Sequence, residues 1–242
     1  MYDKNNPETI RKMFGSIAKE YDRGNAVLSF NMHKKWDNTL IKEVLVPKNP
    51  QVVLDLCCGT GDIGLTYLTK WRSDQLAPCH MYMLDFCPEM LLYARQKAVQ
   101  SGAVRHRLEF IQGDAQAIPL PDRSVDAITV AYGIRNVRSP EKCIQEAYRV
   151  LRPGGRMGIL ELTKPKNWFL KIGHKVYLKA ILPFLGKLVA SNKEAYRYLS
   201  SSIEEFISPD EMEKLLTANQ FKNCLQTPLM GGIATIISGT KI

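Results

Sequence analysis

Short apolar runs recur through the middle of the chain and alternate with segments that have the residue pattern of helices. Five runs have the length and composition of buried strands, at residues 51–57, 80–85, 107–112, 125–131 and 156–162. Helical segments separate several of them, at residues 63–70, at 88–100 and from 139 to the Pro153-Gly154-Gly155 stop. Strands that alternate with helices favour a parallel sheet that is covered on both faces, with right-handed crossovers.

Two longer segments flank this alternating region, and both have helical patterns. Residues 1–46 precede the first strand, and residues 163–205 follow the fifth. Proline cannot continue a helix through its interior, so we expect Pro183 to break the second segment into two helices.

The chain closes with another helix and two further strand-like runs. The helix is expected over 209–218, and the runs over 221–227 and 233–238. Gly231-Gly232 lies between the two runs and predicts the turn of a hairpin. The pattern as a whole predicts an α/β fold in a single domain: a doubly wound, mostly parallel, seven-stranded, Rossmann-like sheet with an antiparallel C-terminal hairpin.

Composition adds limits to this picture. The chain has 242 residues, 45% of them hydrophobic and 24% charged, which suits one globular core. It lacks an apolar run long enough to span a membrane, and residues 1–10 lack the apolar core of a signal peptide, so we expect a cytoplasmic protein. The six cysteines have no Cys-x-x-Cys spacing, so we expect reduced thiols and neither a metal site nor disulfides.

A glycine-rich loop follows the first predicted strand. Gly59, Gly61 and Gly64 satisfy the G-x-G-x-x-G pattern of dinucleotide sites. Asp55 and Asp62 flank the loop, however, and carboxylates there would repel a pyrophosphate. They suit S-adenosyl-L-methionine, which carries a positive ammonium and a positive sulfonium and no phosphate. We therefore favour an S-adenosylmethionine site in which Asp55, Gly59 and Gly61 contact the cofactor.

Polar residues at the next strand ends extend this cofactor site. Asp85 ends the second strand, where it can accept both ribose hydroxyls or, alternatively, cap the helix that starts at Pro88. Asp114 and Ala115 follow the third strand, and we expect them to bind adenine through the carboxylate and the backbone N–H. Thr60 either binds the methionine carboxylate or satisfies the start of its own helix. These residues predict an S-adenosylmethionine-dependent methyltransferase of class I.

Four further stretches are distinctive. They are the run from Tyr21 and Asp22 through Asn25, Ser29 and His33 to Trp36, the Tyr132-Gly-Ile-Arg135-Asn136-Val stretch, residues 149–161 and residues 196–203. On these motifs the chain resembles the ubiquinone/menaquinone biosynthesis C-methyltransferases, the demethylmenaquinone methyltransferase family, over nearly its whole length. It departs from the family's usual residues at Gly24, Asn31, Lys34, Cys58 and Ile207. These departures bear on the shape of the acceptor pocket and leave the acidic cofactor contacts intact.

The resemblance implies methylation of a ring carbon in a prenylated, demethylated naphthoquinol or benzoquinol. His33 is the simplest candidate for the base that takes a phenolic proton, or else it is a hydrogen-bonded structural histidine. Tyr21 could orient the quinol or pack in the core. Arg135 and Asn136 follow the fourth strand, where Arg135 could stabilise a phenolate oxygen or pair with a helix acid. We expect residues 1–46 to cap the acceptor site.

Charge is unevenly distributed along the chain, whose net charge is +9. Residues 162–193 contain no Asp or Glu, but they contain seven lysines interleaved with apolar residues. Apolar positions that share a helical face are Phe169, Ile172, Val176 and Tyr177. This pattern is typical of a basic amphipathic helix at an anionic membrane surface, here the inner face. The alternative is that residues 163–205 form a lid whose apolar face packs on the sheet.

Rival functions share parts of this pattern. A methyltransferase for another small phenolic or lipid acceptor would use the same cofactor residues. The charge suggests a nucleic-acid methyltransferase, but the chain lacks an Asn/Asp-Pro-Pro-Tyr-like box, so we expect no nucleic-acid partner. The intact acidic strand ends argue against a catalytically silent binding module. A second copy of the chain, in a homodimer, is a further candidate partner, although the pattern does not decide the oligomeric state.

Overall fold

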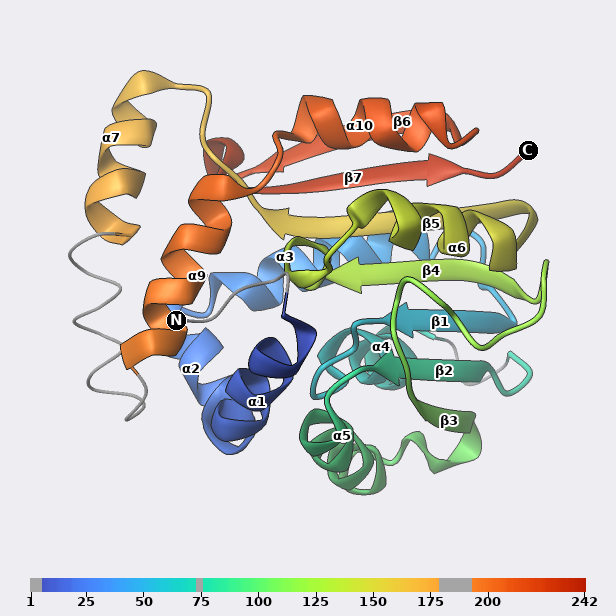
Figure 1. Ribbon diagram of the computed structural model, residues 1–242. Helices are drawn as coiled ribbons and strands as arrows, with labels where there is room; N and C mark the ends of the chain where they lie inside the picture. Colours follow the sequence, from blue (N-terminus) through green and yellow to red (C-terminus); the bar gives the residue numbers. More distant parts are fainter. Residues whose placement is uncertain (1–5, 73–75, 179–192) are drawn as a thin grey trace.

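The computed structural model describes residues 6–72, 76–178 and 193–242 of the chain. Their core is a seven-stranded sheet with the order β3-β2-β1-β4-β5-β7-β6 (Figure 1). The strands are β1 (Val52–Leu56), β2 (His80–Asp85), β3 (Arg107–Gln112), β4 (Val125–Ala131), β5 (Leu151–Leu162), β6 (Lys222–Leu229) and β7 (Ala234–Thr240). β1 to β5 are parallel, and β7 runs antiparallel to its neighbours β5 and β6. The predicted doubly wound sheet with an antiparallel C-terminal hairpin is confirmed.

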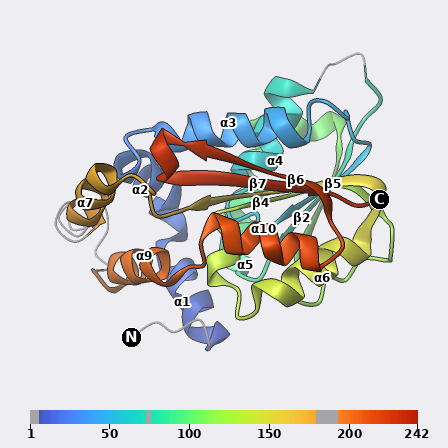
Figure 2. The ribbon, with the colours of Figure 1, turned by 90° about the horizontal axis from the view of Figure 1, so that it is seen from above.

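Helices cover both faces of this sheet. One face carries α3 (Met32–Val44), α4 (Asp62–Thr66) and α5 (Pro88–Gln100). The other face carries α6 (Pro140–Val150) and α10 (Pro209–Ala218). Figure 2 shows α3 and α10 on opposite sides of the strands. Each helix layer buries one apolar face of the sheet, which is why the central strands are apolar along nearly their whole length.

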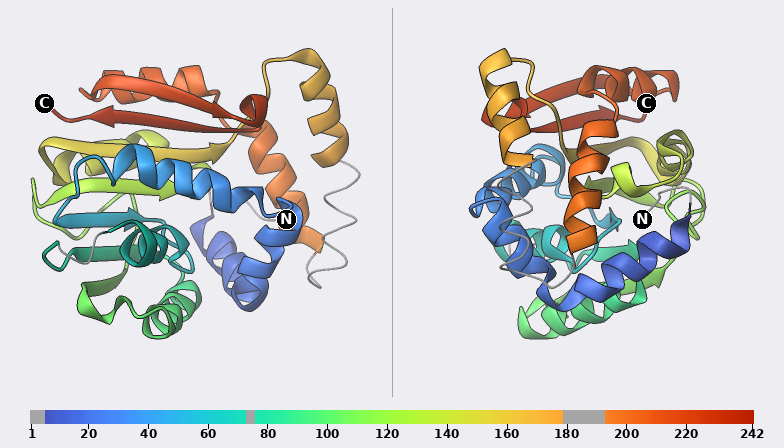
Figure 3. Two further views of the ribbon diagram at one scale, coloured as in Figure 1. Left: turned by 180° about the vertical axis from the view of Figure 1, so that it is seen from behind. Right: turned by 60° about the vertical axis from the view of Figure 1, so that its left-hand side comes forward.

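The remaining helices gather beyond the carboxyl ends of the parallel strands (Figures 1 and 3). They are α1 (Pro7–Ile17), α2 (Tyr21–Leu28), α7 (Trp168–Val176) and α9 (Lys193–Glu205). The predicted helical character of the two flanking segments is therefore confirmed for their described residues. Pro183, where we expected a break, lies outside the described residues. Among the helices of the described ranges, none is both long enough and apolar enough to cross a bilayer.

Local signals in the sequence explain where several helices begin. Proline occupies the first turn of α1, α5, α6 and α10, where its missing N–H costs no hydrogen bond. Ser208 and Glu211 form a complete capping box at the start of α10. After α4, the helix predicted over 63–70 continues as a π-helical turn over Tyr67–Trp71.

The turn of the closing hairpin uses both predicted glycines. Gly231 and Gly232 have φ angles of 67° and 93°, in the left-handed region that disfavours side chains.

The predicted start of the fifth strand at Arg156 is wrong, because β5 begins at Leu151. Val125 of β4 pairs with Leu151, but the pairing resumes only at Ala127 and Arg156. Residues 152–155 therefore leave the ladder opposite a single residue. The Pro153-Gly154-Gly155 turn that ends α6 in the prediction is in fact an irregularity inside the strand.

Candidate active site

A cavity of about 250 Å³ opens at the carboxyl ends of β1 to β4, and we call it the glycine-loop cavity. Gly59, Asp85, Asp114 and Ala115 line it, as the cofactor prediction requires. Its apolar walls include Phe14, Leu84, Phe86 and Met90. Carboxylates together with apolar walls suit a nucleoside, which offers ribose hydroxyls and a flat base.

Two backbone hydrogen bonds hold Asp85 at the edge of this cavity. Its Oδ2 accepts from the Gly59 N–H at 2.8 Å, and its Oδ1 accepts from the Cys87 N–H at 2.9 Å. Each oxygen has a second lone pair, so the carboxylate can still accept two ribose hydroxyls. Burial raises the pKa of Asp85 to about 6, which leaves the group ionised at neutral pH. Asp85 thus orders the loop and the start of α5 while facing the cavity.

The backbone around the loop approaches the cavity closely. Gly59 has a φ of 54°, which favours glycine, and Gly133 needs the absence of a Cβ because one would lie 2.3 Å from the Cβ of Cys57. Gly61 has a φ of 81° but lines neither this cavity nor its neighbours; a Cβ there would meet Ala94 of α5 at 3.3 Å. The structure therefore gives Gly61 a role in the turn and in helix packing.

A smaller cavity of about 50 Å³ lies beside the glycine loop, and we call it the acidic cavity. Asp37, Asp55 and Asp62 line it together with Thr60. Asp55 accepts the Gly64 N–H at 3.0 Å, and burial raises the pKa of Asp55, like that of Asp37, to about 7. A positive group in this cavity would restore the ionised carboxylates, so the acidic cavity fits the ammonium end of S-adenosylmethionine.

Thr60 has protein partners for its hydroxyl. Its Oγ1 donates to Asp22 Oδ1 at 2.6 Å and accepts from Lys97 Nζ at 3.3 Å. Lys97 also forms ion pairs with Asp22 and Asp62. This network ties α2 and α5 to the glycine loop, so the proposed contact of the Thr60 hydroxyl with the methionine carboxylate would have to compete with it.

The largest of these three cavities, of about 380 Å³, lies between α2, α3, α7 and α9, and we call it the apolar cavity. Side chains that line it include Leu28, Met32, Trp36, Leu170, Tyr177 and Ile203. Among its polar neighbours are His33 and Arg135. Tyr21 and Tyr132 line this cavity, the acidic cavity and the glycine-loop cavity, so the three meet at these two rings.

His33 and Tyr132 occupy the junction of the cavities. The Tyr132 hydroxyl donates to Asp37 at 3.0 Å, and its φ of 56° is rare for a residue other than glycine. His33 lines both the acidic and the apolar cavity, and its Nδ1 lies 2.6 Å from Ser29 Oγ. Burial lowers the pKa of His33, so the imidazole is neutral near pH 7. It is hydrogen-bonded, as the structural interpretation requires, and it also faces the place where an acceptor would lie.

Arg135 is buried at 7% exposure and lines the apolar cavity. Its Nη1 donates to Glu161 of β5 and to the Tyr132 carbonyl. Within the described part of the chain, Arg135 Nε has no hydrogen-bond partner, which costs about 1–3 kcal/mol for a buried donor. Asn136 lies differently: its Oδ1 accepts from Tyr198 of α9, and it lines the glycine-loop cavity.

Sequence reasoning missed several residues of this site. Glu161, Asp37, Lys97 and Tyr132 were not predicted to act there. Glu161 had a signal, since it is the one charged residue in an otherwise apolar run over 157–162. Asp37 follows Trp36 directly, at the end of the N-terminal motif.

The sheet order and a cofactor site built from carboxylates define a methyltransferase that depends on S-adenosylmethionine. Solved structures with this fold include such an enzyme from Thermotoga maritima, described as a possible histamine N-methyltransferase (TM-score 0.61, 18% identity, 96% of this chain and 99% of that one). At this identity the likeness shows the fold alone. The model of the ubiE/COQ5 methyltransferase family matches residues 2–241, and the chain belongs to this family. The predicted family, cofactor and class of enzyme, a C-methyltransferase, are confirmed.

Curated relatives match over nearly the whole chain. A demethylmenaquinone methyltransferase from Protochlamydia amoebophila is 49% identical over 99% of this chain and 98% of its own length. A Thermus thermophilus protein with the same name is 37% identical over 95% of this chain and 100% of its own length. A ubiquinone/menaquinone biosynthesis C-methyltransferase from Roseobacter denitrificans is 34% identical over 96% of this chain and 90% of its own length.

Proposed function

We propose that this methyltransferase transfers a methyl group to a ring carbon of a prenylated, demethylated quinol, with demethylmenaquinol as the first candidate. The observation that carries the proposal is the apolar cavity, which meets the cofactor site at Tyr21 and Tyr132. Its volume and lining suit an aromatic ring system with the first part of a prenyl chain. The names of the curated relatives agree with this acceptor. A second candidate is another small phenolic or lipid acceptor.

The polar residues of the apolar cavity supply the acceptor chemistry. When bound, S-adenosylmethionine supplies an electrophilic methyl group on a positive sulfur. His33 accepts a phenolic proton, which increases the electron density on the adjacent ring carbon. Arg135, whose positive side chain lines the cavity, stabilises the resulting oxygen anion. Once the ring carbon has received the methyl group, it loses its own hydrogen as a proton, which restores the aromatic ring. The apolar walls exclude water, which favours a reaction that neutralises charge.

The direct test is transfer of radiolabel from methyl-labelled S-adenosylmethionine to chemically reduced demethylmenaquinol in liposomes. Label on a ring carbon is the expected result. Absence of label, in a protein shown by calorimetry to bind the cofactor, would contradict this acceptor. Demethylated benzoquinols and simple phenols, assayed in parallel, would then identify the second candidate.

The pH dependence of turnover should report the protonation of His33. Desolvation by burial lowers the pKa of His33 below its ordinary value of 6.5, so the imidazole can accept a proton at all higher pH values. We expect kcat to be constant above pH 6.5 and to fall on the acid side with a midpoint below 6.5. Measurement at saturating cofactor keeps Asp85 covered by the ribose, and it keeps Asp37 and Asp55, whose pKa values burial raises to about 7, ionised beside the ammonium group. If His33→Gln is still active and shows the same acid limb, another group is responsible for it.

We also propose that α7 docks on an anionic membrane surface. Four of its large apolar side chains are between 54% and 66% exposed: Trp168, Phe169, Ile172 and Val176. The rings of Trp168 and Phe169 stack with their centroids 3.5 Å apart. Exposed lysines accompany these apolar groups, which is the composition expected of an interfacial helix.

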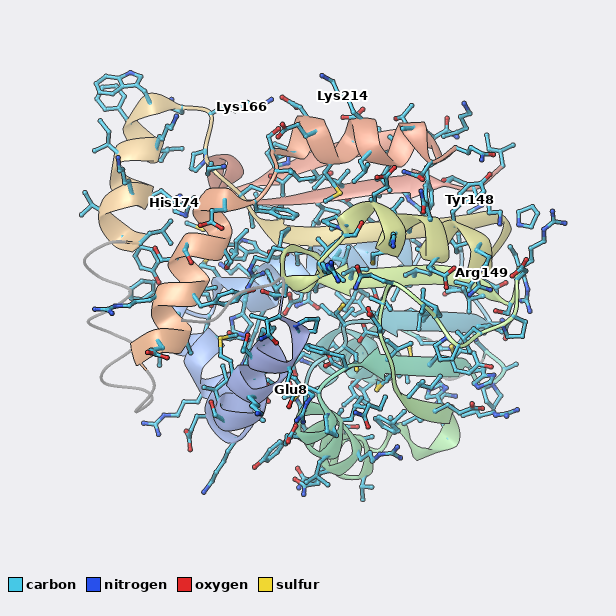
Figure 4. The ribbon with its side chains drawn as sticks, in the orientation of Figure 1. Glu8, Tyr148, Arg149, Lys166, His174 and Lys214 are labelled. Atoms are coloured by element: carbon cyan, nitrogen blue, oxygen red, sulfur yellow. The ribbon has the colours of Figure 1, made fainter. Side chains whose placement is uncertain are left out.

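The other side of α7 faces the protein, as the lid interpretation expects. Leu170, Gly173 and His174 line the apolar cavity, and the exposed Phe169 reaches its rim. His174 is buried on the side of α7 that faces α9 (Figure 4). Lys166, also marked in Figure 4, pairs with Asp210 and holds the segment before α7 to α10. A prenyl chain in the cavity would therefore be close to the proposed membrane surface.

Neutralising lysines of α7 should weaken binding to vesicles. The double variant Lys171→Gln/Lys175→Gln should bind phosphatidylglycerol vesicles about 30-fold less tightly, because each lysine near an anionic leaflet contributes about 1 kcal/mol. Sedimentation with vesicles measures the change. The matched control is Lys48→Gln/Lys222→Gln, which removes two exposed lysines at the opposite edge of the sheet. Equal losses in both variants would indicate a general charge effect and contradict docking through α7.

A further inference from the structure

Ser29 touches the imidazole of His33 in a way that the mechanism above does not use. Ser29 follows the last residue of α2, and its Oγ lies 2.6 Å from the Asn25 carbonyl oxygen and 2.6 Å from His33 Nδ1. The backbone N–H of His33 also points to this Oγ, at 3.4 Å. Ser29 and His33 both line the apolar cavity.

The single proton of the Ser29 hydroxyl determines the direction of both short contacts. The Asn25 carbonyl can only accept, so the hydroxyl proton is directed to it. The contact between Ser29 Oγ and His33 Nδ1 is then a hydrogen bond only if Nδ1 carries a proton and donates it to a serine lone pair. A neutral imidazole has one N–H, so Nε2 is left without a proton and is the basic nitrogen.

We propose that Ser29 is a positioning residue that holds His33 in the Nδ1–H tautomer and thereby presents the Nε2 lone pair to the acceptor. The proposal rests on the proposed function of His33 as the base. The opposite tautomer would place an N–H on Nε2, which cannot take a phenolic proton. Because His33 is only 7% exposed, water cannot readily replace the hydrogen bond that its Nδ1–H donates to Ser29 Oγ.

The tautomer can be measured directly in the full-length protein, without any acceptor, by long-range ¹H–¹⁵N NMR after labelling of histidine. The chain has four histidines, so the loss of one set of signals in His33→Gln identifies those of His33. We expect a protonated Nδ1 and an unprotonated Nε2 near neutral pH. Ser29→Ala should populate the other tautomer, whereas Ser29→Thr, which keeps the hydroxyl, should retain the first. A wild-type protein with its proton on Nε2 would overturn the proposal.

Turnover supplies the second readout. Ser29→Ala should lower kcat about tenfold, on the scale of one neutral hydrogen bond, with the KM for S-adenosylmethionine unchanged. Ser29→Thr should recover most of this loss. Ser101→Ala is the matched control, because Ser101 also follows a helix and donates its hydroxyl to a backbone carbonyl, far from His33 in the sequence; it should turn over normally.

The two readouts separate the possible failures. A changed tautomer in Ser29→Ala with wild-type kcat would overturn the positioning role. If His33→Gln also turned over normally, the proposed base would fail with it. The NMR measurement needs no acceptor. It therefore decides whether His33 carries its proton on Nδ1 even if the quinol assay gives no label.

Discussion

Replacing Glu161 with Gln should destabilise the protein by about 3–5 kcal/mol, because it leaves the charge of a buried arginine without its partner. Glu161 is fully buried and Arg135 nearly so, and they form a direct ion pair. Glu161 also accepts the backbone N–H groups of Leu162 and Arg135, and a side-chain amide cannot replace both oxygens as acceptors. The change in the free energy of unfolding can be measured by urea denaturation.

Two controls distinguish burial of the charge from loss of an ion pair as such. Lys166→Gln breaks the exposed pair with Asp210 and should cost less than about 1 kcal/mol. The double variant Arg135→Met/Glu161→Gln removes both charges and keeps one amide oxygen as an acceptor, so it should recover part of the lost stability while remaining inactive. A double variant as unstable as Glu161→Gln would show that packing, and not the unpaired charge, causes the loss.

Replacing Asp85 with Asn should weaken binding of S-adenosylhomocysteine about 100-fold or more. The variant loses the negative charge that would accept both ribose hydroxyls, and hydrogen bonds to charged groups contribute about 1.5–3 kcal/mol each. Asn at this position also has only one oxygen, so its NH₂ group would face the backbone N–H of either Gly59 or Cys87, and one hydrogen bond would be lost. Isothermal titration calorimetry measures the dissociation constant.

Asp126 offers a matched control for this variant. Its Oδ2 accepts two backbone N–H groups, from Gln51 and Val52, at the edge of the sheet opposite the cofactor site. Asp126→Asn should lower stability without changing the affinity for S-adenosylhomocysteine. If Asp85→Asn binds S-adenosylhomocysteine with wild-type affinity, Asp85 does not contact the cofactor and serves only to order the glycine loop and the start of α5.

The residues of the cofactor site could be predicted because their positions follow from local pattern and from topology. In a parallel sheet, residues that follow successive strands meet at one edge, and Asp85 and Asp114 each follow an apolar run. The glycine loop has a recognisable spacing. Gly61 shows the limit of that spacing, because the same positive φ serves either ligand contact or helix packing.

The pairs that complete the site could not be predicted in the same way. Lys97 meets Asp22 across 75 positions of the chain, and Arg135 meets Glu161 across 26. Such contacts depend on how α2 and α5, or β5 and the turn after β4, pack against each other. The hydrophobic periodicity of the sequence does not indicate which of these elements pack together. The start of β5 was missed for a related reason, since a strand that leaves its ladder and returns to it has the local composition of a turn.

The two-sided character of α7 has a consequence for how the acceptor arrives. One side of this helix is a wall of the apolar cavity, and the other exposes aromatic and aliphatic groups. An enzyme held on a bilayer through α7 would meet its acceptor in two dimensions, so its rate would follow the mole fraction of quinol among the lipids and not the amount per volume. A prenyl chain moved through water would cost about 0.8 kcal/mol for each CH₂. Exchange along the leaflet avoids that cost both for the arriving substrate and for the departing product.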